Sequence, residues 1–262
     1  MAAKKQNIQI EGHKLIYHVD EVSKWLRGEI TAPIYVEVGV ISVCNHRCIF
    51  CAIDYLKCKG AVLDKDVLIG NLKDMAEFGV KSIMFSGDGE PLLYQDLPEV
   101  IKKAKEFGLD IAITSNGSQL TEEKSKTILK HLSWIKISID AGTKKTYAKI
   151  HGCKEEDFAK LLSNIKFACN YRKKNNLSCK IGCQCLLLKD NIEEVEDLML
   201  KVKDIGVDYL VLKPYSKHPD SMNTQWVDIK EYEETLTKLS EKYSTDSFQV
   251  IFRKSTSQEI KK

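Results

Sequence analysis

Residues 82–115 read SIMFSGDGEPLLYQDLPEVIKKAKEFGLDIAITS, and this stretch contains one complete strand–helix–strand unit. Ser82-Ile83-Met84-Phe85 predicts a strand, residues 97–107 predict a helix that ends at Gly108, and Ile111-Ala112-Ile113-Thr114 predicts a second strand. Two strands joined by a helix lie parallel in one sheet, because a crossover of this length carries the chain back to the starting edge. The unit therefore indicates an α/β fold.

The same alternation continues on both sides of this unit. Strands are expected at residues 34–41, 134–139, 180–188 and 209–212, and helices at residues 66–78, 122–132, 155–174 and 192–205. A further helix at 232–242 and a strand at 248–252 follow the last full cycle. Such alternation predicts a parallel sheet with helices outside, and it does not say whether the sheet closes into a barrel.

The chain is expected to divide into an accessory segment, residues 1–33, and one core domain, residues 34–262. In the accessory segment, Ile8 and Ile10 followed by Leu15 and Tyr17 suggest a hairpin, and residues 21–26 suggest a short helix.

The composition excludes several classes of protein. Lys+Arg 40 against Asp+Glu 37 gives a net charge of +3, which is not the basic surface of a nucleic-acid-binding protein. The amino terminus lacks the apolar stretch of a signal peptide, and no long apolar run predicts a membrane span. We expect a cytoplasmic protein, in which nine cysteines indicate metal binding or catalysis rather than disulfides.

Directly after the strand predicted at 34–41 comes Cys44-Asn45-His46-Arg47-Cys48-Ile49-Phe50-Cys51, a C-x3-C-x2-C pattern. Thiolates favour zinc, copper(I) or iron–sulfur clusters over hard cations. Three cysteines leave one coordination position open, which ligation by a substrate requires. Two alternatives stay open: Cys58 or His46 completes a structural zinc site, or the cysteines are inert core residues.

The pattern C-x3-C-x-Φ-C, with Phe50 before the last cysteine, resembles the signature of the radical S-adenosylmethionine (SAM) superfamily. Other segments at successive strand ends resemble that family in the expected order: Gly87-Asp88-Gly89-Glu90-Pro91, Thr114-Ser115-Asn116-Gly117, Ser138-Ile139-Asp140-Ala141, Gly182-Cys183-Gln184 with Asn191 downstream, and Lys213-Pro214-Tyr215-Ser216. The resemblance covers nearly the whole chain, with Asp88 standing where many members have a glycine.

The resemblance implies a parallel (βα)6 partial TIM-type barrel with a carboxy-terminal helix and strand. It implies that Cys44, Cys48 and Cys51 hold a [4Fe–4S] cluster whose unligated iron binds SAM. An electron from an external donor resembling flavodoxin or ferredoxin then cleaves SAM, and the resulting 5′-deoxyadenosyl radical takes a hydrogen atom from the substrate.

The resemblance also assigns residues to SAM. Gly87 and Gly89 would let the backbone approach the methionine amino group, because glycine has no Cβ. The other expected cofactor contacts are Phe50, Asp88, Glu90, Ser115, Ser138, Asp140 and Gln184. Each has a structural alternative: Asp88 and Glu90 as turn residues, the short polar groups as ordinary hydrogen-bond partners, and Phe50 as core. His151 stands near the place where some relatives have an arginine that binds the SAM carboxylate, so that contact is not carried over.

Strand alternation places Cys183 and Cys185 on one face and Gln184 on the other. We therefore expect the two cysteines to pack as small apolar residues rather than to hold a second cluster, and Cys58, Cys153 and Cys169 to be incidental.

Lys213, Tyr215 and His218 follow the strand predicted at 209–212 and are candidates for contacting the substrate. This segment resembles a poorly characterised branch of the family that often continues into a cysteine-rich SPASM extension, whereas here no cysteine follows Cys185. The favoured substrate is a small polar metabolite or a sugar- or nucleotide-linked precursor. The alternatives are a peptide-modifying enzyme of the same family and a non-catalytic zinc or iron–sulfur protein.

Overall fold

The computed structural model describes residues 14–51, 60–216, 221–223, 225 and 227–254. Its centre is one seven-stranded sheet in which every neighbouring pair is parallel and the strands follow their order in the chain. The strands are β1 (Tyr35–Val38), β2 (Ser82–Phe85), β3 (Asp110–Ser115), β4 (Trp134–Ser138), β5 (Lys180–Leu187), β6 (Tyr209–Pro214) and β7 (Gln249–Phe252). Among the described residues no pairing joins β7 to β1, so the sheet is an open, partial barrel.

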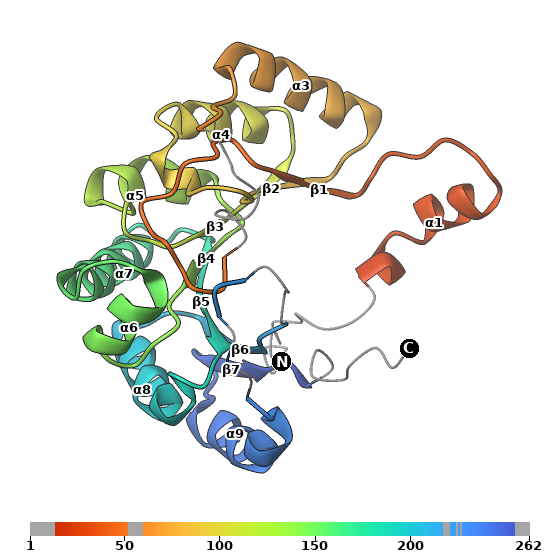
Figure 1. Cartoon of the computed structure of the whole chain (residues 1–262). Helices are drawn as coiled ribbons and strands as arrows, with labels where there is room; N and C mark the ends of the chain where they lie inside the picture. Colours follow the sequence, from red (N-terminus) through yellow and green to blue (C-terminus); the bar gives the residue numbers. More distant parts are fainter. Residues whose placement is uncertain (1–13, 52–59, 217–220, 224, 226, 255–262) are drawn as a thin grey trace.

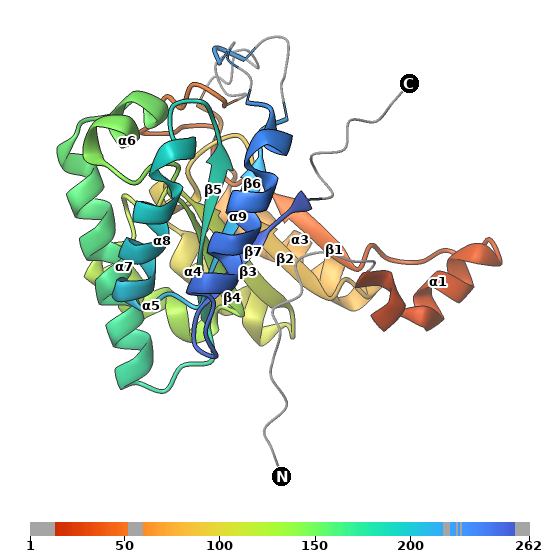
Figure 2. The same cartoon turned by 90° about the horizontal axis from the view of Figure 1, so that it is seen from below.

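The helices lie on the convex side of the curved sheet, and the concave side is turned away from them (Figures 1 and 2). They are α3 (Lys65–Phe78), α4 (Leu97–Glu106), α5 (Glu122–Ile128), α6 (Lys144–His151), α7 (Glu156–Lys174), α8 (Val195–Ile205) and α9 (Ile229–Tyr243). Short 3-10 turns occur at η2 (Pro91–Leu93), η3 (Leu129–His131) and η4 (Ile192–Glu194). This is the partial TIM-type barrel that the sequence led us to expect.

The register of the strands decides which side chains face the helices. Paired residues of parallel strands point to the same side of a sheet, and consecutive residues point to opposite sides. Ile137 pairs with Cys183, and both are fully buried in the core between sheet and helices. Ser138 pairs with Gln184, and these half-buried residues therefore lie on the concave side. The prediction that Cys183 and Cys185 pack as apolar core residues is confirmed by their full burial.

Several elements differ from the sequence-based expectation. β7 pairs with β6 and so belongs to the same sheet, which has seven parallel strands rather than six with a separate strand behind them. The helices expected at 122–132 and 192–205 each contain a 3-10 turn. Helix α6 was not expected at all, because eight residues are too few for an apolar period to be evident.

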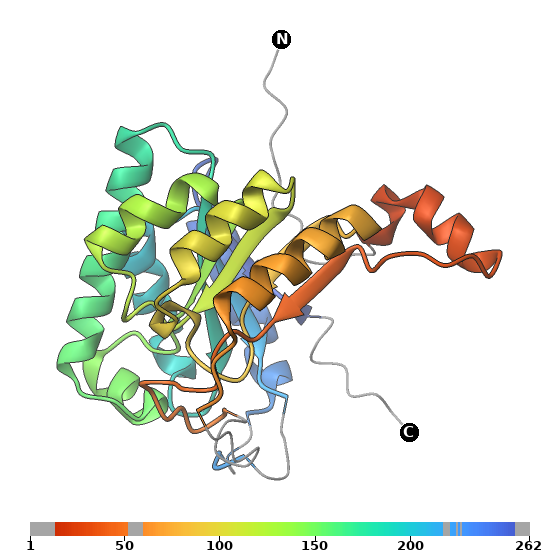
Figure 3. The ribbon, with the colours of Figure 1, turned by 90° about the horizontal axis from the view of Figure 1, so that it is seen from above.

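The amino-terminal segment contains η1 (Lys14–Tyr17) and α1 (Val19–Leu26), and Figure 3 shows it projecting from the body beyond α3 and β1. The expected helix is present, but the expected hairpin is wrong at Leu15 and Tyr17, which lie in the 3-10 helix, since two apolar residues two positions apart also fit a helical turn. Ile8 and Ile10 lie outside the described residues. Helix α1 has no buried residue.

None of the helices in the described part of the chain has both the length and the apolar character needed to span a bilayer.

Candidate active site

Cys44, Cys48 and Cys51 lie half-buried in the loop that follows β1, at the carboxyl edge of the sheet. Burial raises the pKa of the Cys48 thiol, and negative charge at Asp140, Cys51 and Cys44 raises it further. Burial likewise raises the pKa of Cys44, to which charge at Glu90 and Cys51 also contributes. The three thiols are therefore close enough to repel one another as thiolates, and bound cations would offset that repulsion.

The end of helix α6 fixes the position of this cysteine loop. The backbone N–H of Arg47 donates to the carbonyl of His151 at 2.9 Å, and that of Ile49 donates to the carbonyl of Ile150 at 3.0 Å. Gly152 ends α6 with φ +57, and a Cβ at this position would lie 2.3 Å from the carbonyl oxygen of Arg47. The close approach of loop and helix therefore requires glycine.

A second contact holds the loop from the segment after β6. The carbonyl of Ile49 accepts hydrogen bonds from the backbone N–H of Asn223 at 2.8 Å and from the Ser221 hydroxyl at 3.0 Å. The Ser221 oxygen in turn accepts from the Tyr215 hydroxyl at 2.8 Å. Sequence reasoning missed Ser221 and Asn223, because no local pattern indicates a contact 172 residues away along the chain.

The glycine-rich segment after β2 packs its backbone against the cysteine loop. A Cβ at Gly89 would lie 2.1 Å from the carbonyl oxygen of Ile41, and the Glu90 N–H donates to the carbonyl of Val43 at 2.9 Å. Gly87 has φ +112, which favours glycine, and Asp88 is exposed. The absence of a Cβ at these glycines therefore allows the two loops to pack closely against each other.

The side chain of Glu90 is a brace between loops. It is 2% exposed, and it accepts hydrogen bonds from the Ser115 hydroxyl at 2.6 Å, the Asn116 N–H at 2.7 Å and the Leu92 N–H at 3.0 Å. Burial is the main cause that raises the pKa of Glu90, against which the hydrogen bonds act. Of the two roles considered for Glu90 and Ser115, the structure shows the ordinary hydrogen-bond role, and contact with SAM stays a prediction.

Asp140, just beyond β4, is 1% exposed and accepts a hydrogen bond at Oδ1 from the backbone N–H of Leu186 at 2.6 Å. Its Oδ2 is buried 3.3 Å from Nε2 of His151 and accepts no hydrogen bond from the described residues. Phe50 is half-buried, with its ring edge-on to the His151 ring at 6.3 Å between centroids. Asp140 and Phe50 therefore converge on the neighbourhood of Cys48 from different elements.

Of the substrate candidates, Lys213 is half-buried at the end of β6, and Tyr215 contacts Ser221 as described above. His218 lies outside the described residues. The pKa of Lys213 is lowered by burial and then by the positive charge of Arg253. Arg253 follows β7 directly and was not singled out from the sequence, although its place behind a strand was the available signal.

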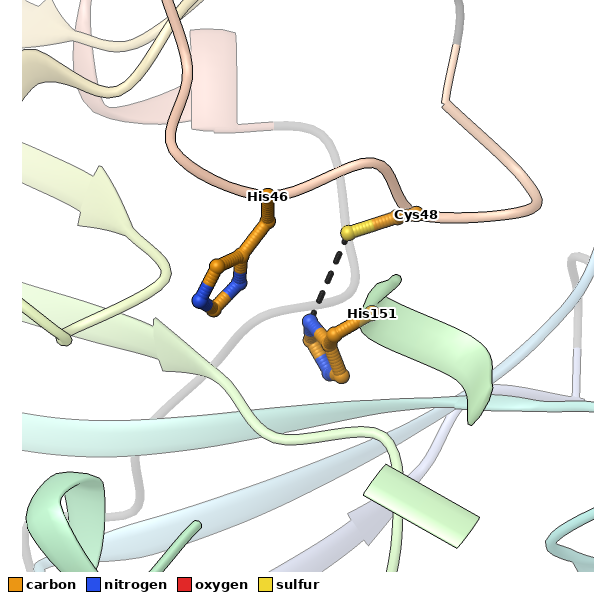
Figure 4. Close-up of side chains that lie close together, drawn as sticks. All are labelled: His46, Cys48 and His151. Atoms are coloured by element: carbon orange, nitrogen blue, oxygen red, sulfur yellow. Dashed lines mark hydrogen bonds between the residues drawn. The ribbon is translucent and has the colours of Figure 1, made fainter. Parts of the chain in front are cut away.

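The arrangement of histidines and cysteines among the described residues bears on whether the site holds a single ion or a cluster. His46, Cys48 and His151 offer ligand atoms within 4.8 Å of one another (Figure 4). Cys44, Cys48 and Cys51 do not form such a group. Ligands of a single ion must converge this closely, while an iron–sulfur cubane separates its cysteines more widely. The three sulfurs are therefore not placed together around one ion, which leaves room for a cluster between them, and the group that one zinc ion could use is His46, Cys48 and His151. Cys58, the other alternative zinc ligand, lies outside the described residues.

This chain is similar to known proteins in both sequence and fold. A family model described as the Radical SAM superfamily matches residues 38–202. A probable GTP 3′,8-cyclase of Saccharolobus islandicus is 27% identical over 210 residues, which cover 78% of this chain and 65% of that protein. An S-adenosylmethionine-dependent nucleotide dehydratase of Lacinutrix mariniflava is 38% identical over 112 residues, which cover 41% of this chain and 23% of that protein.

Among solved structures, Streptococcus suis SuiB bound to S-adenosylmethionine superposes with a TM-score of 0.71 at 16% sequence identity, covering 94% of this chain and 57% of SuiB. A likeness at this identity shows a shared fold. The chain spans 65% of the length of the cyclase and 57% of SuiB, so each relative has regions without a counterpart here.

Proposed function

This chain belongs to the radical SAM superfamily, and from that premise we propose that Cys44, Cys48 and Cys51 hold the [4Fe–4S] cluster of an enzyme acting on a small polar or nucleotide-linked substrate. Enzymes of this family use a [4Fe–4S] cluster and SAM as cofactors. When bound, these groups supply a 5′-deoxyadenosyl radical that removes a hydrogen atom from the substrate. The observation that carries the assignment is that one loop, at the carboxyl edge of the sheet, holds three free, half-buried cysteines.

The chain's own residues then have distinct tasks. The backbone around Gly87 and Gly89 would line the SAM site, and Ser138 and Gln184 would present polar groups to SAM from the concave side. Asp140 would contact SAM through Oδ2, which accepts no hydrogen bond from the described residues. Phe50 would exclude water beside Cys48. Members of this family need an external one-electron donor, for which a flavodoxin- or ferredoxin-like protein stays our prediction, as does the cytoplasmic location.

Anaerobic reconstitution tests the cluster assignment. We expect about four irons per chain and release of 5′-deoxyadenosine from SAM after a reductant is added. The Cys48→Ala variant should lose both, whereas Cys183→Ala, a matched control in the core, should keep both. Zinc bound without iron, or full iron content in Cys48→Ala, would contradict the assignment.

Lys213 and Arg253 support a substrate that carries negative charge. They lie beyond the paired residues Leu212 and Phe252 of β6 and β7, and the pKa of Lys213 is lowered first by burial and then by the charge of Arg253. Lys213 lies two residues beyond Val211, the partner of Gln184, and therefore on the concave side of the sheet, where its cation can contact an anionic group such as a phosphate. The names of the cyclase and the dehydratase refer to nucleotides, which favours this substrate class over peptides.

Binding of GTP tests this substrate class with a defined probe. We expect the loaded enzyme to bind GTP, and Lys213→Ala to raise the Kd about tenfold, the scale of one charge-assisted hydrogen bond. Lys166→Ala removes an exposed charge on α7 and should leave the Kd unchanged. No measurable binding of GTP or other nucleoside triphosphates by the wild type would contradict the nucleotide proposal and leave the family membership standing.

A further inference from the structure

His151, the last residue of α6, points its ring at one of the three cysteines. Its Nδ1 lies 3.4 Å from Sγ of Cys48, as the dashed line in Figure 4 shows. The residue is 0% exposed, and its own backbone carbonyl accepts the hydrogen bond from Arg47 in the cysteine loop. Side chain and backbone of the same residue therefore hold the loop at Cys48.

The second ring nitrogen decides where the proton is. The backbone N–H of Asp140 donates to Nε2 of His151 at 3.3 Å, whereas Oδ2 of Asp140, also 3.3 Å from Nε2, makes no hydrogen bond with it, so Nε2 acts as an acceptor. A neutral imidazole carries one proton, which is then on Nδ1 and faces the sulfur. A cysteine bound to iron has no proton of its own, so the contact with Cys48 can only be Nδ1–H donating to sulfur.

Packing fixes the ring in this orientation. The ring stacks on that of Tyr147 with centroids 4.1 Å apart and an angle of 26° between the planes. The His46 ring meets it edge-on at 5.5 Å and the Phe50 ring at 6.3 Å. Rotation of the imidazole away from Cys48 would have to displace these aromatic neighbours.

We propose that His151 is a positioning residue that donates a hydrogen bond to the Cys48 ligand and thereby raises the reduction potential of the cluster. The inference rests on the proposed ligation by Cys48. One electron from the external donor adds negative charge to the cluster and its thiolates, and a donor at sulfur stabilises the reduced state more than the oxidised one. His151 itself neither gains nor loses a proton in this step.

Two substitutions of His151 separate the hydrogen-bond donor from the aromatic ring. In His151→Phe the stacking on Tyr147 is retained and the N–H is lost, whereas in His151→Asn the amide nitrogen takes the place of Nδ1. We expect His151→Phe to make reduction about tenfold less favourable, equivalent to about 59 mV for one electron. His151→Asn should have a reduction potential close to that of the wild type. Tyr147→Phe, which changes the adjacent ring without touching Cys48, should leave the potential unchanged.

The measurement is a redox titration of the reconstituted cluster followed by electron paramagnetic resonance, with iron content determined on each sample. An unchanged potential in His151→Phe at full iron content overturns the inference while the proposed function stands. If His151→Phe fails to hold iron, the wild type with isotopically labelled histidine nitrogen is measured instead. The label should show magnetic coupling to the reduced cluster, and this coupling should vanish in His151→Asn. Absence of that coupling in the wild type overturns the inference about His151. Full iron content in Cys48→Ala would instead contradict the proposed cluster ligands.

Discussion

The carboxylate of Glu90 ties the segment after β2 to the segment after β3, because its three hydrogen-bond donors are Leu92, Ser115 and Asn116. Asn116 in turn donates to the Asn45 side chain at 3.0 Å and lies 3.8 Å from Sγ of Cys44. A single buried residue thus connects the glycine-rich segment with the cysteine loop, and its substitution should loosen both segments.

Glu90→Ala should lower the free energy of unfolding by about 2 to 4 kcal/mol, since it leaves three buried donors without an acceptor. Urea denaturation followed by circular dichroism measures the change. Glu156→Ala removes an exposed carboxylate in the first turn of α7 and should change stability much less. Equal stability of the two variants would show that water replaces the Glu90 carboxylate without cost.

Glu90 should also make stability depend on pH. Its pKa in the folded protein is raised, with burial as the main cause, whereas in the unfolded chain it is about 4.3. Above that value the unfolded chain loses the proton first, so stability due to this group falls as pH rises through the folded-state pKa. Glu90→Gln should therefore show a flatter decline of unfolding free energy above about pH 4.3 than the wild type. Parallel curves for the two proteins would contradict this.

At the scale of elements, the junction between α6 and the cysteine loop organises the site. The Thr143 hydroxyl accepts from the Thr146 N–H at the start of α6, and Gly152 ends the helix in a left-handed conformation. Because the helix has only eight residues, a small change in backbone conformation at either end would move His151 relative to Cys48.

Gly152→Ala should reduce iron content and SAM cleavage several-fold, because a Cβ would lie 2.3 Å from the carbonyl oxygen of Arg47. Gly206→Ala is the matched control: Gly206 also ends a helix, at φ +92, and no atom lies within 4 Å of the position of its Cβ. Both variants bear the left-handed strain of about 1 to 2 kcal/mol, so thermal unfolding should shift in both, and further in Gly152→Ala because of the added clash with Arg47. If both keep full iron content, the loop does not depend on this close approach.

At the scale of the whole molecule, the sheet and its helices form the body, and α1 projects from it. Removing residues 1–28 should leave iron content and SAM cleavage within about twofold of the full chain, because α1 buries no residue. Truncation before α9 should instead prevent folding, since it removes the buried Leu236, Phe248 and Val250. Loss of the cluster in the shortened amino-terminal variant would show that the segment supports the site.

The sequence predicted the strands well because each is a short run of apolar residues between turns, as at Ser82–Phe85 and Trp134–Ser138. It also predicted the order of the segments that meet at the carboxyl edge. It could not predict the contact between Ser221 and Ile49 or the acceptors of Asn116, because such pairs are set by tertiary packing and not by local pattern. Whether Glu90 contacts SAM or braces a loop was likewise undecidable from spacing alone.

In the part of the chain that the structure describes, the outer edges of β1 and β7 have no strand partner, which bears on the selectivity of the site for substrates. A long substrate could use a gap between these two strands to place only its reactive end beside the cysteine loop, so we expect its overall length to matter little for binding. We expect discrimination to come instead from the charged end of the substrate, which the half-buried Lys213 on the concave side can contact. Analogues that differ in tail length should accordingly be accepted alike, whereas those that lack the anionic head should be refused.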